Sequence, residues 1–178
     1  MVTRDAVHTE GEGSVMQTFL PVPSFTETAQ VLDKQRLNKQ ALEAWQIMMT
    51  NLKLDPEGNP REPKGWRTHP AVLMWKGHDM ALLEYIRAMV SEWTLRGYKS
   101  TILNKAEATI ATAIDRGLVV YPYADMPKWY KNARTLNAIT KSHRIALLSK
   151  NYQWYSRWGW KEDTGVKPES YEYVWREA

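Results

Sequence analysis

Apolar residues recur at helical spacing between positions 32 and 52, and this repeat restricts the chain to folds that bury one side of a long helix. A step of about 100° per residue gathers these positions on that side. The opposite side carries two acids, two bases and an amide: Asp33, Arg36, Lys39, Gln40 and Glu43. Such a polar set can bind phosphate and transfer protons. Pairs such as Lys39 and Glu43 are also common on solvated helices, and taken alone the pattern favours that simpler interpretation.

Further helices are predicted along the rest of the chain. The helix with the polar stripe starts at a cap, Ser24 or Thr26, and runs to about Leu52. A densely apolar pattern predicts a central buried helix over residues 71–95. Other patterns predict two more helices, over residues 99–116 and 136–150, and a helical turn over residues 126–130. The prediction is an all-α fold, a single compact helical domain with a central buried helix. Residues 1–15 are polar and lack periodicity, so we expect a flexible N-terminal extension followed by a domain over residues 16–178.

Composition excludes several classes of function. The 178 residues include no cysteine, which excludes disulfides, thiolate nucleophiles and zinc–thiolate sites, and the four histidines stand at unrelated spacings. We therefore expect neither a metal nor a cofactor. There is no secretory signal and no apolar run close to the ~20 residues of a spanning helix, so we expect a cytoplasmic monomer without a membrane partner. The net charge of +4 is compatible with a polyanion partner, and nine Trp and nine Tyr suit base stacking as well as a helical core.

Several motifs occur in the same order as in one enzyme family. Gln35-Arg36-Leu37 followed by Glu43 matches a Gln-His-Leu-x-x-x-x-x-Glu pattern, with arginine in place of histidine. The order continues through Pro70, Gly77-His78, Arg96-Gly97-Tyr98 and the aromatic tail Trp154-Tyr155-Ser156-Arg157-Trp158-Gly159. Over residues 16–158 the chain therefore resembles the pyrimidine-dimer DNA glycosylases, the phage endonuclease V family, and in particular a bacterial and phage branch of it.

The resemblance implies DNA repair by base excision in a bacterial or phage-infected cell. Such an enzyme binds double-stranded DNA, flips a nucleotide out of the helix, attacks the sugar with an amine and holds the adduct as an imine, which allows AP lyase activity. By position, Glu43 is the carboxylate that takes a proton and stabilises the cationic sugar. Arg36 replaces the family's histidine near the scissile sugar, and Lys39 points to the same side. With Thr18, these residues form the candidate catalytic set.

The candidate DNA-binding residues carry amide, acidic, basic or aromatic side chains. They are Gln40, Asp33, His69, His78, Arg144, His143, Trp129, Trp154 and Tyr155. Ordinary structural roles compete with DNA contact for several of them. A histidine before a proline often caps a helix, His143-Arg144 can pair with acids such as Glu107 or Asp115, and tryptophans and an aromatic tail usually pack in a core.

One departure from the family leaves two functions open. The family's nucleophile is the α-amine of a threonine exposed by removal of the initiator Met, whereas here fifteen residues precede Met16, and Gln17 would not normally permit its removal. Initiation at Met16, a folded-back terminus or a lysine such as Lys39 can each restore an amine. The first function is a DNA glycosylase, with or without lyase activity, acting on damaged or modified pyrimidines such as pyrimidine dimers. The alternative is a non-catalytic DNA-binding domain that retains the fold.

Overall fold

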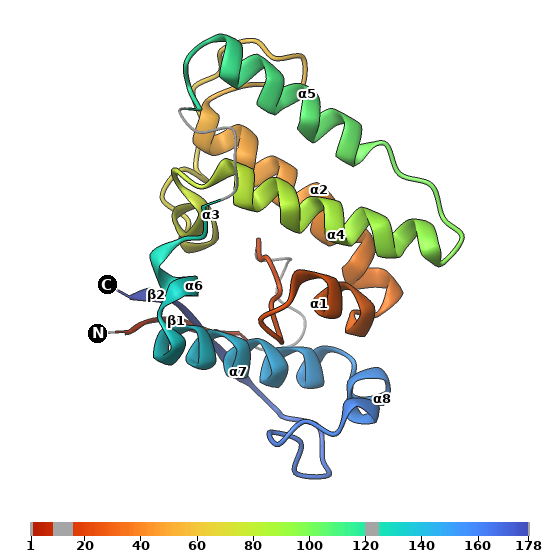
Figure 1. The fold of residues 1–178 in the computed structure, drawn as a ribbon. Helices are drawn as coiled ribbons and strands as arrows, with labels where there is room; N and C mark the ends of the chain where they lie inside the picture. The colour runs from red at the N-terminus through yellow and green to blue at the C-terminus, as the bar shows by residue number, and fades with distance from the viewer. Residues whose placement is uncertain (1, 9–15, 120–124, 178) are drawn as a thin grey trace.

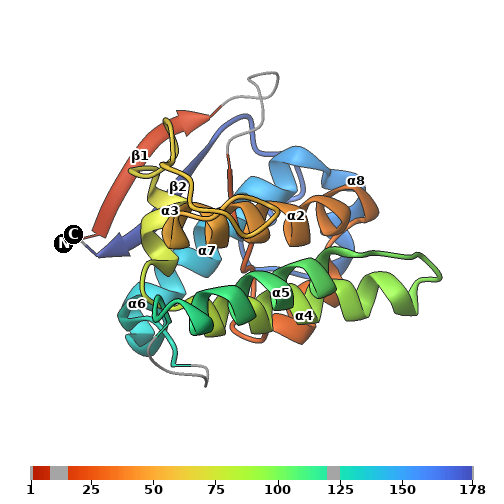
Figure 2. The ribbon, with the colours of Figure 1, turned by 90° about the horizontal axis from the view of Figure 1, so that it is seen from above.

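The computed structural model describes residues 2–8, 16–119 and 125–177. These residues form a mostly helical domain, and the order of the elements and their arrangement are shown in Figures 1 and 2. The expected all-α class is therefore confirmed. None of the described helices is both long and apolar enough to cross a membrane.

The helix with the polar stripe is preceded by a separate short helix. Helix α1 (Phe25–Val31) begins at the Ser24 cap, whose hydroxyl accepts a hydrogen bond from the Glu27 N–H at 3.1 Å. Helix α2 (Lys34–Leu52) starts only after Leu32 and Asp33, which have extended backbones. The prediction of one continuous helix up to Leu52 is therefore wrong. The break exists because the backbone N–H of Asp33 is bonded to Tyr155, a residue 122 positions away, instead of continuing the helix.

The central apolar segment is also divided. Helix α3 (Pro70–Trp75) ends before Gly77, which has a φ of 80°, and α4 (Asp79–Leu95) begins immediately afterwards. A positive φ is cheap for glycine, so this residue turns the chain where the apolar pattern predicted one helix. Helix α4 packs against α1, α2 and α5 (Ile102–Asp115), which places it at the centre of the domain as expected.

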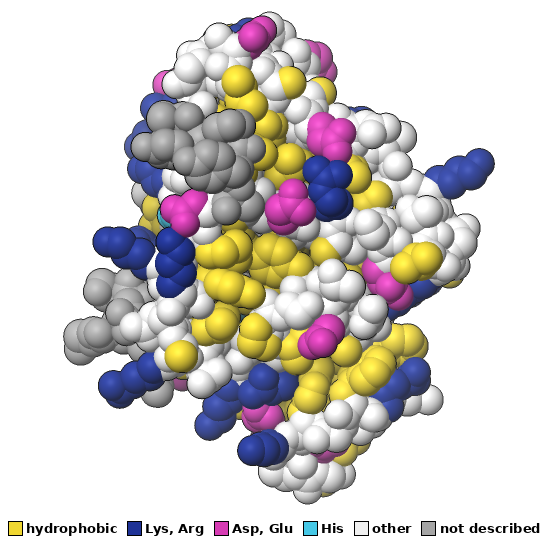
Figure 3. Space-filling model, viewed as in Figure 1, with side chains coloured by type: hydrophobic (Ala, Val, Ile, Leu, Met, Phe, Trp, Pro, Cys, Tyr) yellow, Lys and Arg dark blue, Asp and Glu magenta, His cyan; other side chains and the backbone are white. Residues whose placement is uncertain are grey.

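The C-terminal third contains the remaining helices. Helices α6 (Lys128–Lys131) and α7 (Ala133–Lys150) agree with the predicted turn and helix, and α8 (Tyr152–Tyr155) leads into the 3-10 helix η1 (Ser156–Trp158). On the face in Figure 3, hydrophobic side chains cross the middle of the molecule, and Lys and Arg side chains gather toward its lower and left-hand edges.

A two-stranded antiparallel sheet joins the two ends of the chain. Strand β1 (Val2–His8) pairs with β2 (Tyr171–Glu177), with Val2 opposite Glu177 and His8 opposite Tyr171. Strand β2 packs on α7, and its Val174 N–H donates to the Ser142 hydroxyl at 3.0 Å. Neither strand was predicted from the sequence, and residues 1–15 were expected to form a flexible extension. Of these, residues 1 and 9–15 lie outside the described part of the chain.

Candidate active site

The five residues at 16–20 run through the interior of the domain beside α2, and all of them are buried. Gln40 of α2 holds this segment, because its Oε1 accepts a hydrogen bond from the Phe19 N–H at 2.7 Å. The Tyr85 hydroxyl, from α4, lies 2.8 Å from the same oxygen and 2.6 Å from the Phe19 carbonyl. An amide side chain that is only 1% exposed therefore joins three separate parts of the fold.

Glu43 lies one turn further along α2, against the same segment. The Gln40 amide nitrogen donates to Glu43 Oε2 at 3.2 Å, and the backbone N–H of Gln17 donates to the same carboxyl group. Burial raises the pKa of Glu43 to about 7, although both hydrogen bonds and the nearby charges of Lys39 and Lys150 lower it. A carboxyl group with a pKa near neutrality can both accept and release a proton at physiological pH. This is the arrangement that a proton-transfer residue requires.

A second polar network lies at the start of the same helix. Asp33 is 5% exposed, and its carboxylate accepts hydrogen bonds from the Tyr155 hydroxyl at 2.5 Å and from Arg36 Nη1 at 3.1 Å. Asn151 adds a longer contact of 3.4 Å to Asp33. Burial and the Asp33 charge raise the pKa of Tyr155 far above its ordinary value, so the phenol stays protonated and donates. This network joins α2 to α8, and Arg36 takes part in it through its bond to Asp33.

Residues 143 and 144 of α7 hold the segment that follows Phe19. The His143 ring is fully buried, and its Nδ1 accepts a hydrogen bond from the Leu20 N–H at 2.7 Å. Burial, with the neighbouring Arg144 charge, lowers the pKa of His143 to about 3, so the ring is neutral. Arg144 donates from Nε to Glu162 at 2.7 Å and from Nη1 to the Pro21 carbonyl at 2.8 Å. Its acidic partner is thus Glu162, not Glu107 or Asp115.

The remaining residues predicted to act in catalysis or DNA binding make hydrogen bonds within the fold. Thr18 is 2% exposed, and its hydroxyl accepts a hydrogen bond from Trp75 Nε1 at 2.9 Å. His69 caps α3 by accepting from the Ala71 N–H at 3.1 Å, and His78 Nδ1 lies 2.9 Å from the Asp125 carbonyl. Two indole N–H groups donate to backbone carbonyls at 2.7 Å, Trp129 to Met74 and Trp154 to Val31.

Comparison of the sequence with known families gives one match. The family model of pyrimidine dimer DNA glycosylase matches residues 16–105, which is half of the chain and includes the buried segment, α2 and α4. The chain belongs to the pyrimidine dimer DNA glycosylase family. Neither the curated proteins nor the solved structures gave a match.

Of the catalytic set predicted for this glycosylase family member, only Lys39 lies close enough to act on Glu43 by its charge, whereas Arg36 bonds to Asp33 and Thr18 to Trp75. Gln40, predicted as a DNA-binding residue, instead donates to Glu43. Sequence reasoning selected these residues. It missed Gln17, Tyr85 and Lys150, which complete the surroundings of Glu43. Gln17 contributes a backbone group, which carries no side-chain signal, and Lys150 approaches from the far end of α7. Among the described residues there is no group of three or more His, Asp or Glu side chains arranged to hold a metal ion.

Proposed function

We propose that this protein is a DNA glycosylase that removes damaged or modified pyrimidines, such as pyrimidine dimers, from double-stranded DNA. The observation that supports this most directly is the Glu43 carboxyl group, held between Gln40 and the Gln17 backbone with its pKa raised to about 7 by burial. Reaching the sugar requires that the nucleotide rotate out of the duplex. This rotation costs a few kcal/mol, least at damaged pairs, so damage itself contributes selectivity.

In the proposed reaction, a neutral amine attacks C1′ of the sugar. The C1′–N bond breaks, and its electron pair leaves with the base, which takes up a proton. Glu43 accepts a proton from the attached amine, and a proton delivered to the ring oxygen O4′ opens the sugar to a protonated imine. Loss of a C2′ proton then breaks the C3′–O bond in the lyase step, and water hydrolyses the imine. Glu43, as a carboxylate, also stabilises the positive charge on the sugar.

We further propose that the amine is the α-amine of a chain that starts at Met16. Met16 directly precedes Gln17, whose backbone N–H donates to Glu43, so a terminus at Met16 brings its amine next to the carboxyl group. Two lysines also lie close enough to act on the Glu43 charge, Lys39 four residues before it and Lys150 at the end of α7. They provide the amine in a chain that starts at Met1.

Borohydride trapping tests both parts of the proposal. The chain begun at Met1 and the chain begun at Met16 are each incubated with a duplex that carries an abasic site or a thymine dimer, then reduced. We expect a covalent adduct with the shorter chain, and peptide mapping should place it on Met16. An adduct on Lys39 or Lys150 would retain the imine mechanism and reassign the amine.

A result without any adduct separates the remaining functions. Base release without trapping would indicate a glycosylase that lacks the lyase step. Salt-sensitive DNA binding with neither trapping nor base release would overturn the enzyme proposal and leave a DNA-binding domain.

A further inference from the structure

Strand β1 lies at the rim of the molecule, outside β2 (Figure 2). Its pairing with β2 is irregular, because the register shifts between Val2 and Arg4 and again between Arg4 and Val7. Such shifts interrupt the hydrogen-bond ladder of a strand pair. Among the described elements, β1 packs mainly on β2. It is therefore held chiefly by one strand edge.

Strand β2, in contrast, is held by the interior of the domain. The ring of Tyr173 makes edge contacts with the rings of Phe19 and His143, at centroid distances of 6.2 and 5.8 Å. The ring of Trp175 makes a similar contact with His69 at 5.8 Å. These contacts come from α7, from the start of α3 and from the buried segment, so they are independent of β1.

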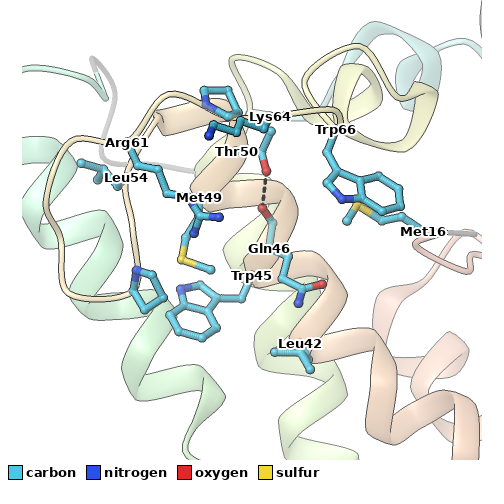
Figure 4. Close-up of a pocket in the computed structure, with 12 residues that line it drawn as sticks. Met16, Leu42, Trp45, Gln46, Met49, Thr50, Leu54, Arg61, Lys64 and Trp66 are labelled. Atoms are coloured by element: carbon cyan, nitrogen blue, oxygen red, sulfur yellow. Dashed lines mark hydrogen bonds between the residues drawn. The ribbon is translucent and has the colours of Figure 1, made fainter. Parts of the chain in front are cut away.

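Met16, where the shorter chain of the proposed function begins, is also held within the domain. Figure 4 shows Met16 beside Trp66, and both line the cavity between α2 and the loop that follows it. The ring of His69, which contacts β2, lies 5.3 Å from the ring of Trp66. A chain begun at Met16 should therefore keep β2 in place and expose the edge that β1 covers.

The hydrogen-bonding groups on this edge belong to Tyr173 and Trp175. Successive residues of a strand direct their backbone N–H and C=O groups to opposite edges. The Val174 N–H donates to the Ser142 hydroxyl at 3.0 Å, so its two neighbours present their groups to the edge where β1 lies. A row of unpaired backbone groups is a template for pairing with another chain, and Tyr, Val and Trp all favour strands.

The sequence of β2 is complementary to itself in one antiparallel register. Val174 is the middle residue of the strand, so pairing it with its own copy places Glu172 opposite Arg176 at both ends. The same register places Tyr173 opposite Trp175, whose backbone groups face this edge. Glu172 and Arg176 are exposed, and they fall at positions that are not hydrogen-bonded to each other, where side chains come closest. A shift of two residues in either direction removes both charge pairs.

We propose that β2 of the chain begun at Met16 pairs with β2 of a second copy, antiparallel about Val174, and that β1 prevents this dimer in the full chain by covering the same edge. A two-fold axis relates the copies, so each contributes the same residues. The contact is confined to one pair of strands, so we expect a dimer that dissociates on dilution. The inference rests on the start at Met16 in the proposed function and on none of its chemistry.

Sedimentation velocity without DNA compares the two chains over a range of concentrations. The full chain should keep the mass of a monomer, whereas the chain begun at Met16 should approach twice its monomer mass as concentration increases. A synthetic peptide of residues 2–8 should return the shorter chain to monomer, and a scrambled peptide should not. A dimer that forms equally in the full chain, or that is insensitive to the peptide, would place the contact elsewhere and overturn the proposal.

Charge reversal tests the register. In the shorter chain, Glu172→Arg sets arginines opposite each other and Arg176→Glu sets glutamates opposite each other, so each variant alone should dimerise about tenfold more weakly. Mixed in equal amounts, the two variants restore both opposite-charge pairs and should form a heterodimer as stable as the original dimer. Arg116→Glu, at the exposed end of α5, is the matched control and should dimerise like the unchanged chain.

The mixing experiment also separates folding from pairing, because a variant that fails to fold cannot be rescued by its complement. The proposal is overturned if the shorter chain stays monomeric or unfolds, if both charge reversals behave as Arg116→Glu, or if the mixture does not associate. None of these results bears on base release, which is measured separately on the same preparations. A dimer in a chain that releases no base would support the β2 contact and overturn only the glycosylase proposal.

Discussion

At the scale of single residues, Glu43 differs from the other acids of the polar stripe because opposing effects act on the pKa of its carboxyl group. Burial disfavours its charge, while Gln40, the Gln17 backbone, Lys39 and Lys150 favour it. The sequence could identify this residue as a candidate, because Glu43 lies in the polar stripe of a predicted helix and also occupies the position of the glutamate in the motif. It could not predict the raised pKa, because the carboxyl group lies against the segment at 16–20, and contacts between segments separated along the chain leave no local signal in the sequence.

We expect Glu43→Gln to abolish base release while duplex binding stays within about tenfold, because the amide keeps the shape of the side chain but cannot accept a proton. Base release and the Kd for a lesion duplex are measured on the same preparation. Equal loss of both would show that Glu43 has a structural role instead.

The difference in stability between wild type and this variant should depend on pH. The pKa of Glu43 rises from 4.5 to about 7 on folding, so the folded state binds the extra proton between these values, and the wild-type protein loses stability as pH rises through that window. Glu43→Gln does not titrate. Its stability relative to wild type should therefore increase from pH 4.5 to 7 and stay level above pH 7, as measured by urea unfolding. A pH-independent difference between the two proteins would contradict the raised pKa.

Gln40 is predicted to be a positioning residue whose loss also weakens the fold. Gln40→Leu leaves the Phe19 N–H without its acceptor and removes the donor to Glu43, and a buried unpaired polar group costs about 1–3 kcal/mol. We expect urea unfolding to show a loss of about 2 kcal/mol. Gln35→Leu, on the exposed side of the same helix, is the control and should change stability by no more than about 0.5 kcal/mol. Similar effects at both positions would indicate that the hydrogen bonds of Gln40 are unimportant.

At the scale of elements, sequence periodicity identified the helices but not the points at which two of them are interrupted. The apolar repeat continues through Leu32 and through Gly77, so each interruption was predicted as helix. The first depends on Tyr155, which bonds both the backbone and the carboxylate of Asp33 from the far end of the chain. The second depends on Gly77, which has a positive φ. A helical pattern can contain a glycine, so this residue alone did not indicate that the helix ends there.

The contact between α7 and the buried segment should be sensitive to acid. His143 has a folded pKa of about 3 against 6.5 for a free ring, so the unfolded chain binds the additional proton and stability falls as pH decreases below 6.5. His143→Gln retains an acceptor for the Leu20 N–H but does not titrate. Relative to this variant, wild type should lose about 1.4 kcal/mol for each pH unit below 6.5. Urea midpoints at pH 7.5 and pH 5 measure the difference, and parallel changes in both proteins would contradict it.

At the scale of the whole molecule, the pairing of the two chain ends is the feature that sequence reading could least predict. Strands β1 and β2 bring together segments more than 160 residues apart, and no turn connects them. Aromatic residues stand at alternate positions 171, 173 and 175, but nothing in the sequence pairs them with residues 2–8. In the structure Tyr171, Tyr173 and Trp175 are buried, and their strand packs on α7.

The arrangement predicts that a chain begun at Met16 still folds. Removing residues 1–15 deletes β1, but the contacts that bury β2 against α7, including the Val174–Ser142 hydrogen bond, come from residues that remain. Gln17, Gln40, Glu43 and Tyr85 likewise all remain in place. We expect circular dichroism to show unchanged helix content and cooperative unfolding, with a Tm lower by several degrees, about what a loss of 1 kcal/mol produces in a domain of this size. Non-cooperative unfolding of the shorter chain would show that β1 is essential to the fold, and would exclude Met16 as the start of the active protein.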